Sequence, residues 1–381
     1  MKKIAIFIGG YLPAKNYGGP VTSIANLVDI LGDEYEFWIV SNNHEYKEKK
    51  PLKDIKSGWN QVGKAKVIYL PESEFVYARF LEILKEINAD VAYLSSVFYL
   101  PNLKFIKVAK KLNVAIVLAP RGELFDNAIR NGKTKKKLYI SFLRFMKIYK
   151  GVVFHATMEE EMIKLQEYFH IKRDNIFVIP NMHGRLNQRE VPDKKSGEMR
   201  LIYLARIHEH KNLQVAIKAV TKSKNRIVFD IYGPIEQEAY WKTCEELIST
   251  APSNISIQYK GGLEPQEAKL KYMEYHCSIL PTASENYGHS ICESLLCGCP
   301  VIISKDTTPW NDVDHVVGYT VQLDSIDGFC EAIDTVCSMD ANQYACLINR
   351  IPDYLDNKLE TPKLLEKYRS MFRLAYSLWR I

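Results

Sequence analysis

Short apolar runs alternate with helical patterns along the first half of the chain. Each run holds four to seven residues, and helical periodicity follows the first run from about Pro20. Alternation of this kind predicts a parallel sheet that is covered by helices on both faces. The runs are KIAIFIG at 3–9, ADVAYLS at 89–95, VAIVLAP at 114–120 and IFVIP at 176–180.

The alternation starts again after a polar stretch at 181–199, which is typical of an inter-domain linker. We therefore predict the α/β class, with two doubly wound domains that bind ligands where the carboxyl ends of their strands face a cleft. The second series of runs is RLIYLARI, RIVFDIYGP, NISIQYKGG, CSILPTA, PVIIS and VVGYTVQL. The predicted parts are a first domain at 1–182, a linker at 183–198, a second domain at 199–355, and a C-terminal helix at 356–381 that packs back on the first domain.

Composition is that of an ordinary soluble protein, with 381 residues, 47% apolar and 25% charged. The first residues resemble a signal peptide, but their apolar run stops after five residues at Gly9-Gly10 and is better explained as a buried strand. The eight cysteines lie irregularly between Cys244 and Cys346, which predicts small buried side chains in a reducing compartment. A cytoplasmic location is expected.

Charge is distributed unevenly, although the net value is only +6. No Asp or Glu occurs from Asn127 to Met158, and aromatic residues alternate with the cations there. Such a helix can lie peripherally on the inner face of an anionic membrane, or it can be a packed helix with a solvated basic side. Nucleic acid is not expected as a partner, because no recognised binding module accompanies the patch. The cations are Arg130, Lys133, Lys135, Lys136, Lys137, Arg144, Lys147 and Lys150.

Two segments offer groups that bind anions. Gly18-Gly19 precede Pro20 at a helix start, where free backbone N–H groups attract an anion, although a Gly-Gly turn is often only a turn. In LARIHEHKN, Arg206 and Lys211 follow a strand, and two cations there could neutralise a diphosphate without a metal.

A third segment, SENYGHSICESLLCGCPVI, places Glu285 and Glu293 eight residues apart. A helix predicted from about Gly288 to Cys297 carries Glu293 and leaves Glu285 on the loop before it. A carboxylate that accepts from adjacent hydroxyls can hold a ribose or a hexose. The backbone N–H groups of residues 286–288 would suit a phosphate.

Together these segments resemble the retaining glycosyltransferases of family 4, which have the GT-B fold of two Rossmann-like domains. The E-x7-E motif matches as Glu285 to Glu293, followed by GCPVI. LARIHEHKN resembles the Arg and Lys segment of the family, VIPN its domain crossover, and NYGGP its N-terminal glycine loop. The resemblance covers nearly the whole chain and is more specific in the second half.

The resemblance implies hexosyl transfer from a nucleoside diphosphate sugar, with retention at the anomeric carbon and with no metal or other cofactor. It implies a UDP-sugar as donor, because uridine diphosphate is the commonest carrier in the family. Arg206 and Lys211 would contact the diphosphate, Glu293 the ribose and Glu285 the donor sugar. The donor site would be completed by Gly18, Gly19, Asn286, Tyr287 and Gly288.

The acceptor side departs from the family pattern. Many members have a His after a strand such as ADVAY, and this chain has LSSVFYL, where Ser95 or Ser96 could fill the space. APRGELFDNAIRNGKTKKK resembles a segment of polysaccharide-building members. Arg121 is the candidate for contact with a glycan or lipid-linked acceptor, and a structural role in its loop is the alternative. The D-x-D at Asp312 to Asp314 is interpreted as a chance match.

Two other classes stay open at this point. A nucleotide-sugar epimerase shares the two-domain architecture but would need no acceptor. A non-catalytic subunit that binds a nucleotide sugar would need neither Arg206 nor Lys211 for chemistry. Product analysis with and without an acceptor separates all three.

Overall fold

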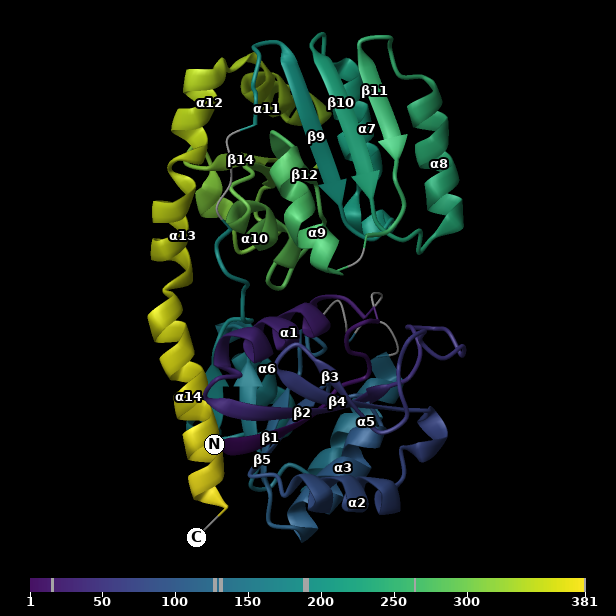
Figure 1. Ribbon diagram of the computed structural model, residues 1–381, viewed down its shortest axis with the longest axis vertical. Helices are drawn as coiled ribbons and strands as arrows, with labels where there is room; N and C mark the ends of the chain where they lie inside the picture. The colour runs from purple at the N-terminus through teal and green to yellow at the C-terminus, as the bar shows by residue number, and fades with distance from the viewer. Residues whose placement is uncertain (15–16, 126–128, 130–132, 188–191, 264, 380–381) are drawn as a thin grey trace. The chain divides into compact units, whose positions relative to one another are not determined.

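The computed structural model describes residues 1–14, 17–125, 129, 133–187, 192–263 and 265–379 (Figure 1). The chain divides into two compact units, one made of Met1–Met182 with Thr361–Ile381 and the other of His183–Glu360. The described part of the segment expected to be a linker groups with the second unit. Lys194 there is only 3% exposed, and its ammonium donates to the carbonyls of Cys337 at 2.7 Å and Met339 at 2.9 Å.

The first unit contains an eight-stranded sheet in the order β3-β4-β2-β1-β5-β6-β7-β8. All neighbouring strands are parallel except β3 and β4. The sequence patterns identified β1, β5, β6 and β8, whereas β2, β3, β4 and β7 were not recognised. The strands are β1 (Lys2–Phe7), β2 (Tyr35–Asn42), β3 (Trp59–Val62), β4 (Ala65–Leu70), β5 (Val91–Ser95), β6 (Ala115–Ala119), β7 (Val153–Ala156) and β8 (Ile176–Val178).

Helices cover both faces of this sheet because alternate strand residues point to opposite sides. In β1, Ala5 and Phe7 pack with α2, α3, α5 and α6, while Ile4 and Ile6 pack with α1 and α14. α14 lies against β5, β6 and β7, and its Tyr368 donates to the carbonyl of Pro180 at 3.1 Å (Figure 1). The helices are α1 (Gly19–Leu31), η1 (Glu72–Glu74), α2 (Tyr77–Ile87), α3 (Pro101–Lys111), α5 (Lys133–Phe145), α6 (Glu159–Phe169), η2 (Arg173–Asn175) and α14 (Thr361–Leu378).

The second unit contains a six-stranded, fully parallel sheet in the order β11-β10-β9-β12-β13-β14. Its strands are β9 (Glu198–Leu204), β10 (Arg226–Tyr232), β11 (Ile255–Tyr259), β12 (Cys277–Leu280), β13 (Val301–Ser304) and β14 (Gly318–Val321). Its helices are η3 (Glu209–Lys211), α7 (Leu213–Lys222), α8 (Glu238–Ser249), α9 (Pro265–Lys271), η4 (Tyr272–Glu274), α10 (His289–Leu296), η5 (Asn311–Val313), α11 (Ile326–Ser338), α12 (Ala341–Ile348) and α13 (Ile351–Leu359).

Each sheet has a point where the strand order reverses. In the first sheet the chain leaves β1 toward β2 on one side and β5 on the other, and in the second sheet β9 lies between β10 and β12. Loops that leave such a strand pair diverge, and ligands of open α/β sheets bind in the resulting crevice. The β1/β5 and β9/β12 switch points are therefore the places to look for sites.

All eight cysteines are free thiols, of which Cys346 is exposed, Cys330 is half-buried and the others are buried. None of the described helices is long and apolar enough to span a membrane.

Candidate functional site

An ion pair joins the loops that leave β9 and β12. Lys211 lies at the end of η3, and its ammonium contacts the carboxylate of Glu285. The two loops are tied together next to this pair, because the N–H of Ala283 donates to the carbonyl of His210 at 2.9 Å. Both charged side chains are 15% exposed. A cation and an acid that the sequence placed in separate segments thus meet at the β9/β12 switch point.

The loop that carries Glu285 is held in one conformation by its surroundings. The N–H of Glu285 donates to the carbonyl of Thr307 at 2.8 Å, and the indole of Trp310 donates to the carbonyl of Tyr287 at 2.6 Å. Gly288 has φ of +73°, and a Cβ there would lie 3.1 Å from Trp310 Nε1. Residues 286–288 therefore form a fixed turn that leads into α10, as the sequence predicted.

Glu293 lies in α10 and has a different environment from Glu285. It is half-buried, and its charge adds to the effect of burial in raising the pKa of Tyr272 in η4. Glu285 faces Lys211 instead. The two acids of the motif therefore have separate neighbours, as two separate roles would require.

Arg206 follows β9 and is paired with an acid that the sequence analysis missed. Its guanidinium lies 2.6 Å from the carboxylate of Glu236, and the Arg206 side chain is 46% exposed. Glu236 comes from the turn after β10, where the N–H of Glu236 donates to the carbonyl of Ile207 at 3.1 Å. Gly233 permits this approach, since a Cβ there would lie 1.9 Å from the carbonyl oxygen of Ala205. The Gly-Pro after β10 was the only signal of such a turn.

The two aspartates of the D-x-D sequence have separate structural partners. The carboxylate of Asp312 lies 2.7 Å from the ammonium of Lys358, and Asp314 accepts from the N–H of Thr320 at 2.8 Å. Within the described ranges, no three His, Cys, Asp or Glu side chains gather in a way that could hold a metal ion.

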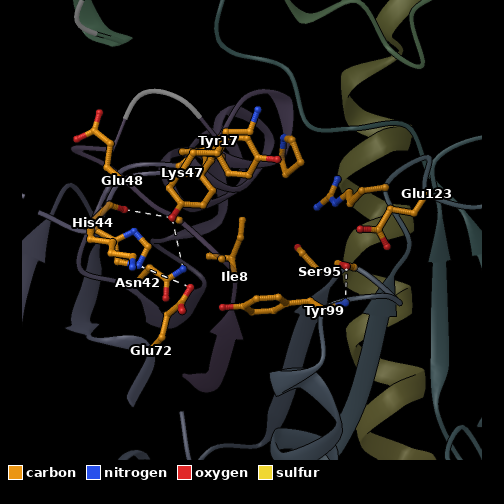
Figure 2. Close-up of a pocket in the computed structure, with 18 residues that line it drawn as sticks. Ile8, Tyr17, Asn42, His44, Lys47, Glu48, Glu72, Ser95, Tyr99 and Glu123 are labelled. Atoms are coloured by element: carbon orange, nitrogen blue, oxygen red, sulfur yellow. Dashed lines mark hydrogen bonds and ion pairs between the residues drawn. The ribbon is translucent and has the colours of Figure 1, made fainter. Parts of the chain in front are cut away.

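A cavity of about 570 Å³ lies at the β1/β5 switch point of the first unit (Figure 2). Gly10 after β1 lets the ring of Tyr17 lie against the backbone, because a Cβ at Gly10 would be 2.0 Å from that ring. Figure 2 shows Tyr17 and Tyr99 on opposite sides of the open space. Gly18 and Gly19 start α1 in the same unit, and Pro20 next to them lines the cavity.

Some buried polar atoms of the residues that line this cavity have no hydrogen-bond partner among the described residues. Ser95 Oγ is buried and makes no hydrogen bond to any described residue, and Figure 2 shows Ser95 beside the open space. The Tyr99 hydroxyl has the side chain of Asn42 as a polar neighbour but is not in hydrogen-bond geometry with any described residue. Ser96 is used differently, since its Oγ accepts from the N–H of Tyr99 at 3.0 Å. Both serines expected at the place of the family histidine line the cavity, and Ser95 is the one whose Oγ has no hydrogen-bond partner among the described residues.

Glu123 is one of three glutamates that line the cavity, together with Glu48 and Glu72. The Glu123 carboxylate accepts from the N–H groups of Val97 at 2.8 Å and Phe98 at 3.3 Å. Burial nevertheless raises the pKa of Glu123, against the effect of these hydrogen bonds. No pattern in the sequence singled out Glu123 or the tyrosines, because they converge only through the fold.

Arg121 also lines the cavity, but its guanidinium is engaged by the protein. It donates to the Tyr93 hydroxyl at 2.8 Å and to Ser23 Oγ at 3.2 Å, and it contacts Asn181. The Tyr93 hydroxyl lies 2.7 Å from Nδ1 of His155, whose Nε2 donates to the carbonyl of Ile179 at 2.8 Å. These contacts favour the structural alternative for Arg121, which ties β6 to α1.

Comparison with known proteins adds a family match for the second unit. Residues 184–351 match the model of the family described as glycosyl transferases group 1. This range contains Arg206, Lys211, Glu285 and Glu293. No curated protein matches the chain.

Solved structures match nearly the whole chain. A glycosyltransferase from Rickettsia africae has 15% identity and a TM-score of 0.70, and the match covers 98% of each chain. HepE from Anabaena in complex with UDP and glucose has 13% identity and a TM-score of 0.69, over 98% of this chain and 100% of HepE. The fold is GT-B. A variant of TarM from S. aureus, in complex with fondaparinux, alpha-GlcNAc-glycerol and UDP, has 13% identity, the same coverage and a TM-score of 0.69.

The GT-B fold agrees with the architecture predicted from the sequence, two parallel-sheet domains with a C-terminal helical tail. In this GT-B chain the family match includes the β9/β12 switch point, while the cavity at β1/β5 lies outside the matched residues.

Proposed function

We propose that this GT-B protein is a glycosyltransferase that moves a hexosyl group from a UDP-sugar to a glycan or a lipid-linked glycan. The observation that carries the proposal is the contact between Lys211 and Glu285 at the β9/β12 switch point. It supports a site in which a cation for the leaving group and an acid for the donor sugar are adjacent. The family match over these residues supports the same activity.

On the donor side, Lys211 and Arg206 would supply the charge that stabilises the departing diphosphate. Each cation is held by a carboxylate, Glu285 for Lys211 and Glu236 for Arg206, so each side chain is already oriented before substrate arrives. Positive charge aimed at the leaving group lowers the barrier because negative charge accumulates there in the transition state. This chemistry requires no metal, and we propose that none takes part.

The remaining donor contacts follow from the loop and helix after β12. Glu293 would accept from the ribose hydroxyls, Glu285 from hydroxyls of the donor sugar, and the N–H groups of Asn286, Tyr287 and Gly288 would meet phosphate oxygens. Their support is the fixed turn that Trp310 and Thr307 hold. Gly18 and Gly19 would add backbone N–H groups at the start of α1.

The acceptor would bind in the cavity of the first unit. Tyr17 and Tyr99 supply faces on which a sugar ring can pack, and Ser95 offers a buried hydroxyl without a partner. A polyhydroxyl ligand suits such a lining because a buried polar atom that stays unpaired costs about 1–3 kcal/mol. In this proposal Arg121 fixes the cavity wall, and any contact between Arg121 and the acceptor would be secondary.

Retention at the anomeric carbon, membership of family 4 and a role in surface polysaccharide synthesis rest on the sequence resemblance. We also propose that the protein works in the cytoplasm, peripherally at the inner face of the membrane. The support is the cluster of cations that continues from α5 to Lys150.

Calorimetric titration with UDP and then GDP, in EDTA, tests the donor site. We expect UDP to bind without metal, and incubation with a UDP-sugar panel to yield a glycosylated product only when acceptor is added. Conversion of the nucleotide sugar without acceptor would instead identify an epimerase. Nucleotide binding without any product would identify a binding subunit. If a folded sample binds neither UDP nor GDP, the assignment of the donor site is overturned.

Single substitutions test the roles proposed for two residues of the donor site. Glu293→Ala should weaken nucleotide binding, and Arg206→Ala should mainly slow transfer. Arg226→Ala is the matched control for the arginine, because Arg226 forms an ion pair with Glu198 at the amino ends of β10 and β9. Wild-type affinity and rate in both site variants would contradict the assignment.

A further inference from the structure

The first unit has an apolar stripe on the outside of α5. Leu138 is 73% exposed, Phe142 is 50% exposed and Phe145 is 84% exposed, and Met146, just beyond the helix, is 49% exposed. Residues spaced by three and four lie on one face of a helix, so the first three form a continuous row. The opposite face is buried, since Ile140 and Leu143 belong to the core of the unit. α5 is therefore apolar on two sides.

A basic pocket of about 340 Å³ lies at the end of this stripe. Arg144, Lys147 and Lys150 line it from the end of α5 and the turn after it, and Lys172 lines it from the segment that follows α6. The described residues of its wall include no carboxylate, and no ion pair between described residues engages these four cations, although the guanidinium of Arg144 contacts Nε2 of His170. Arg130 lies outside the described residues, and the side chain of Lys133 is not described.

The carboxyl end of a helix normally repels an anion, but the carbonyls of Leu143 and Arg144 near the end of α5 are hydrogen-bonded. The N–H of Ile148 donates to the carbonyl of Leu143 at 3.2 Å, and the N–H of Lys147 donates to that of Arg144 at 2.9 Å. The cations thus determine the local field. Burial lowers the pKa of Lys110 beside this turn, and the positive charge of Lys150 adds to that shift.

We propose that the basic pocket binds the phosphate of an anionic lipid headgroup while Phe145 and the apolar stripe enter the bilayer interface. The proposal deepens the membrane location proposed above and rests on it. Charge complementarity identifies the occupant, because an anionic membrane presents phosphate and hydrocarbon side by side, as the pocket and the stripe require. Trp379 extends this surface, since its indole donates to the carbonyl of Gly151 at 2.8 Å next to Lys150.

Sedimentation with vesicles tests the site. The vesicles are phosphatidylcholine alone and phosphatidylcholine mixed with phosphatidylglycerol. We expect binding to the anionic vesicles only, reduced about fivefold by Lys147→Ala and by Lys172→Ala, which is the effect of one cation near the surface. Arg173→Ala is the matched control, because Arg173 is adjacent in sequence but donates to the carbonyl of Ile176 at 2.8 Å and does not line the pocket. Equal losses of vesicle binding in Lys172→Ala and Arg173→Ala would indicate a diffuse basic surface rather than a specific pocket, and would overturn the proposal.

The apolar part is tested by Phe145→Ser against Leu100→Ser, which alters another exposed apolar residue of the first unit, 63% exposed. We expect only the first to lose vesicle binding, by at least about tenfold. Equal binding to neutral vesicles, no binding to anionic vesicles, or a change of oligomeric state in Phe145→Ser without loss of vesicle binding would each overturn the proposal. UDP affinity, measured in the same samples, separates failure of the lipid site from failure of the donor site.

Discussion

The two sheets of this GT-B chain use their switch points in opposite ways. At β9/β12 the converging side chains are ionic, and each described cation of the site is held by a carboxylate, Lys211 by Glu285 and Arg206 by Glu236. At β1/β5 the lining combines aromatic rings with polar groups that have no hydrogen-bond partner among the described residues, including Ser95 and Tyr99. It also contains charged side chains of both signs, namely Lys47, Glu48, Lys49, Glu72, Arg121 and Glu123.

The difference shows that the loops give two similar sheets different binding properties. Paired charges are already oriented, so they can exchange a carboxylate for a phosphate with little rearrangement. In the cavity of the first unit the charged lining residues include both cations and carboxylates, so no single charge dominates. Its aromatic faces and unpaired hydroxyls match the alternating apolar and polar surface of a sugar. The same edge of the same kind of sheet can therefore be suited to a charged ligand or to a neutral one.

Removal of Lys211 should have the largest effect, because it takes a cation from the ionic site at β9/β12. In Lys211→Ala we expect the rate of transfer to fall at least about 100-fold, because the group that neutralises the leaving diphosphate is lost. Steady-state kinetics with saturating acceptor measure the effect. Lys222→Ala removes an equivalent ammonium from an ion pair with Asp327 and should leave the rate unchanged. A loss below about threefold in Lys211→Ala would show that this cation has no part in the chemistry.

Acid should affect the first unit through His155, which is fully buried. Burial and the charge of Arg121 lower the pKa of His155 to about 3, from an ordinary 6.5. The unfolded chain takes up this proton first, so stability is fully present above about pH 6.5 and falls as pH is lowered toward 3, by about 1.4 kcal/mol per pH unit from this group alone.

Thermal unfolding of the wild type and of His155→Gln at pH 7 and pH 5 measures how much stability each protein loses as the pH is lowered. We expect the variant to be less stable at pH 7 but to lose less stability on acidification. His315→Gln is the control, because the His315 side chain is 79% exposed. The same slope in the wild type and His155→Gln would show that another group responds to acid.

The smallest expected effect concerns the cavity at β1/β5. Tyr99→Leu should raise the acceptor KM about tenfold, with the affinity for UDP unchanged, because it removes an aromatic face and an unpaired hydroxyl from the proposed acceptor site alone. Acceptor titrations and calorimetry with UDP give the two values. Tyr77→Leu is the control, since Tyr77 is 36% exposed at the start of α2 and lies outside the cavity lining. A parallel loss of UDP affinity would contradict the separation of the two sites.

Much of the second unit could be predicted from the sequence. The turn at 286–288 and the helix that carries Glu293 lie within one short segment, so local signals are enough to place them. The meeting of Lys211 with Glu285 follows from the rule that ligands bind at the carboxyl edge of a parallel sheet.

The cavity of the first unit could not be predicted in the same way. Tyr17 follows β1, Ser95 ends β5 with Tyr99 shortly after it, and Glu123 follows β6, so no common spacing connects them. Glu236 was missed for the same reason, because it reaches Arg206 only through the close approach at Gly233. The role of Arg121 depended on Tyr93 and Asn181, which no local pattern relates to it.

The position of α14 near the end of the chain has a consequence for folding during synthesis. The second unit is continuous from His183 to Glu360, whereas the first needs Thr361–Ile381 to cover one face of its sheet. Synthesis therefore finishes the second unit before the first has its complete core, although the first is begun earlier. A chain that ends at Glu360 should then show a protease-resistant second unit beside a labile first unit, and equal resistance of both would show that α14 is dispensable for folding.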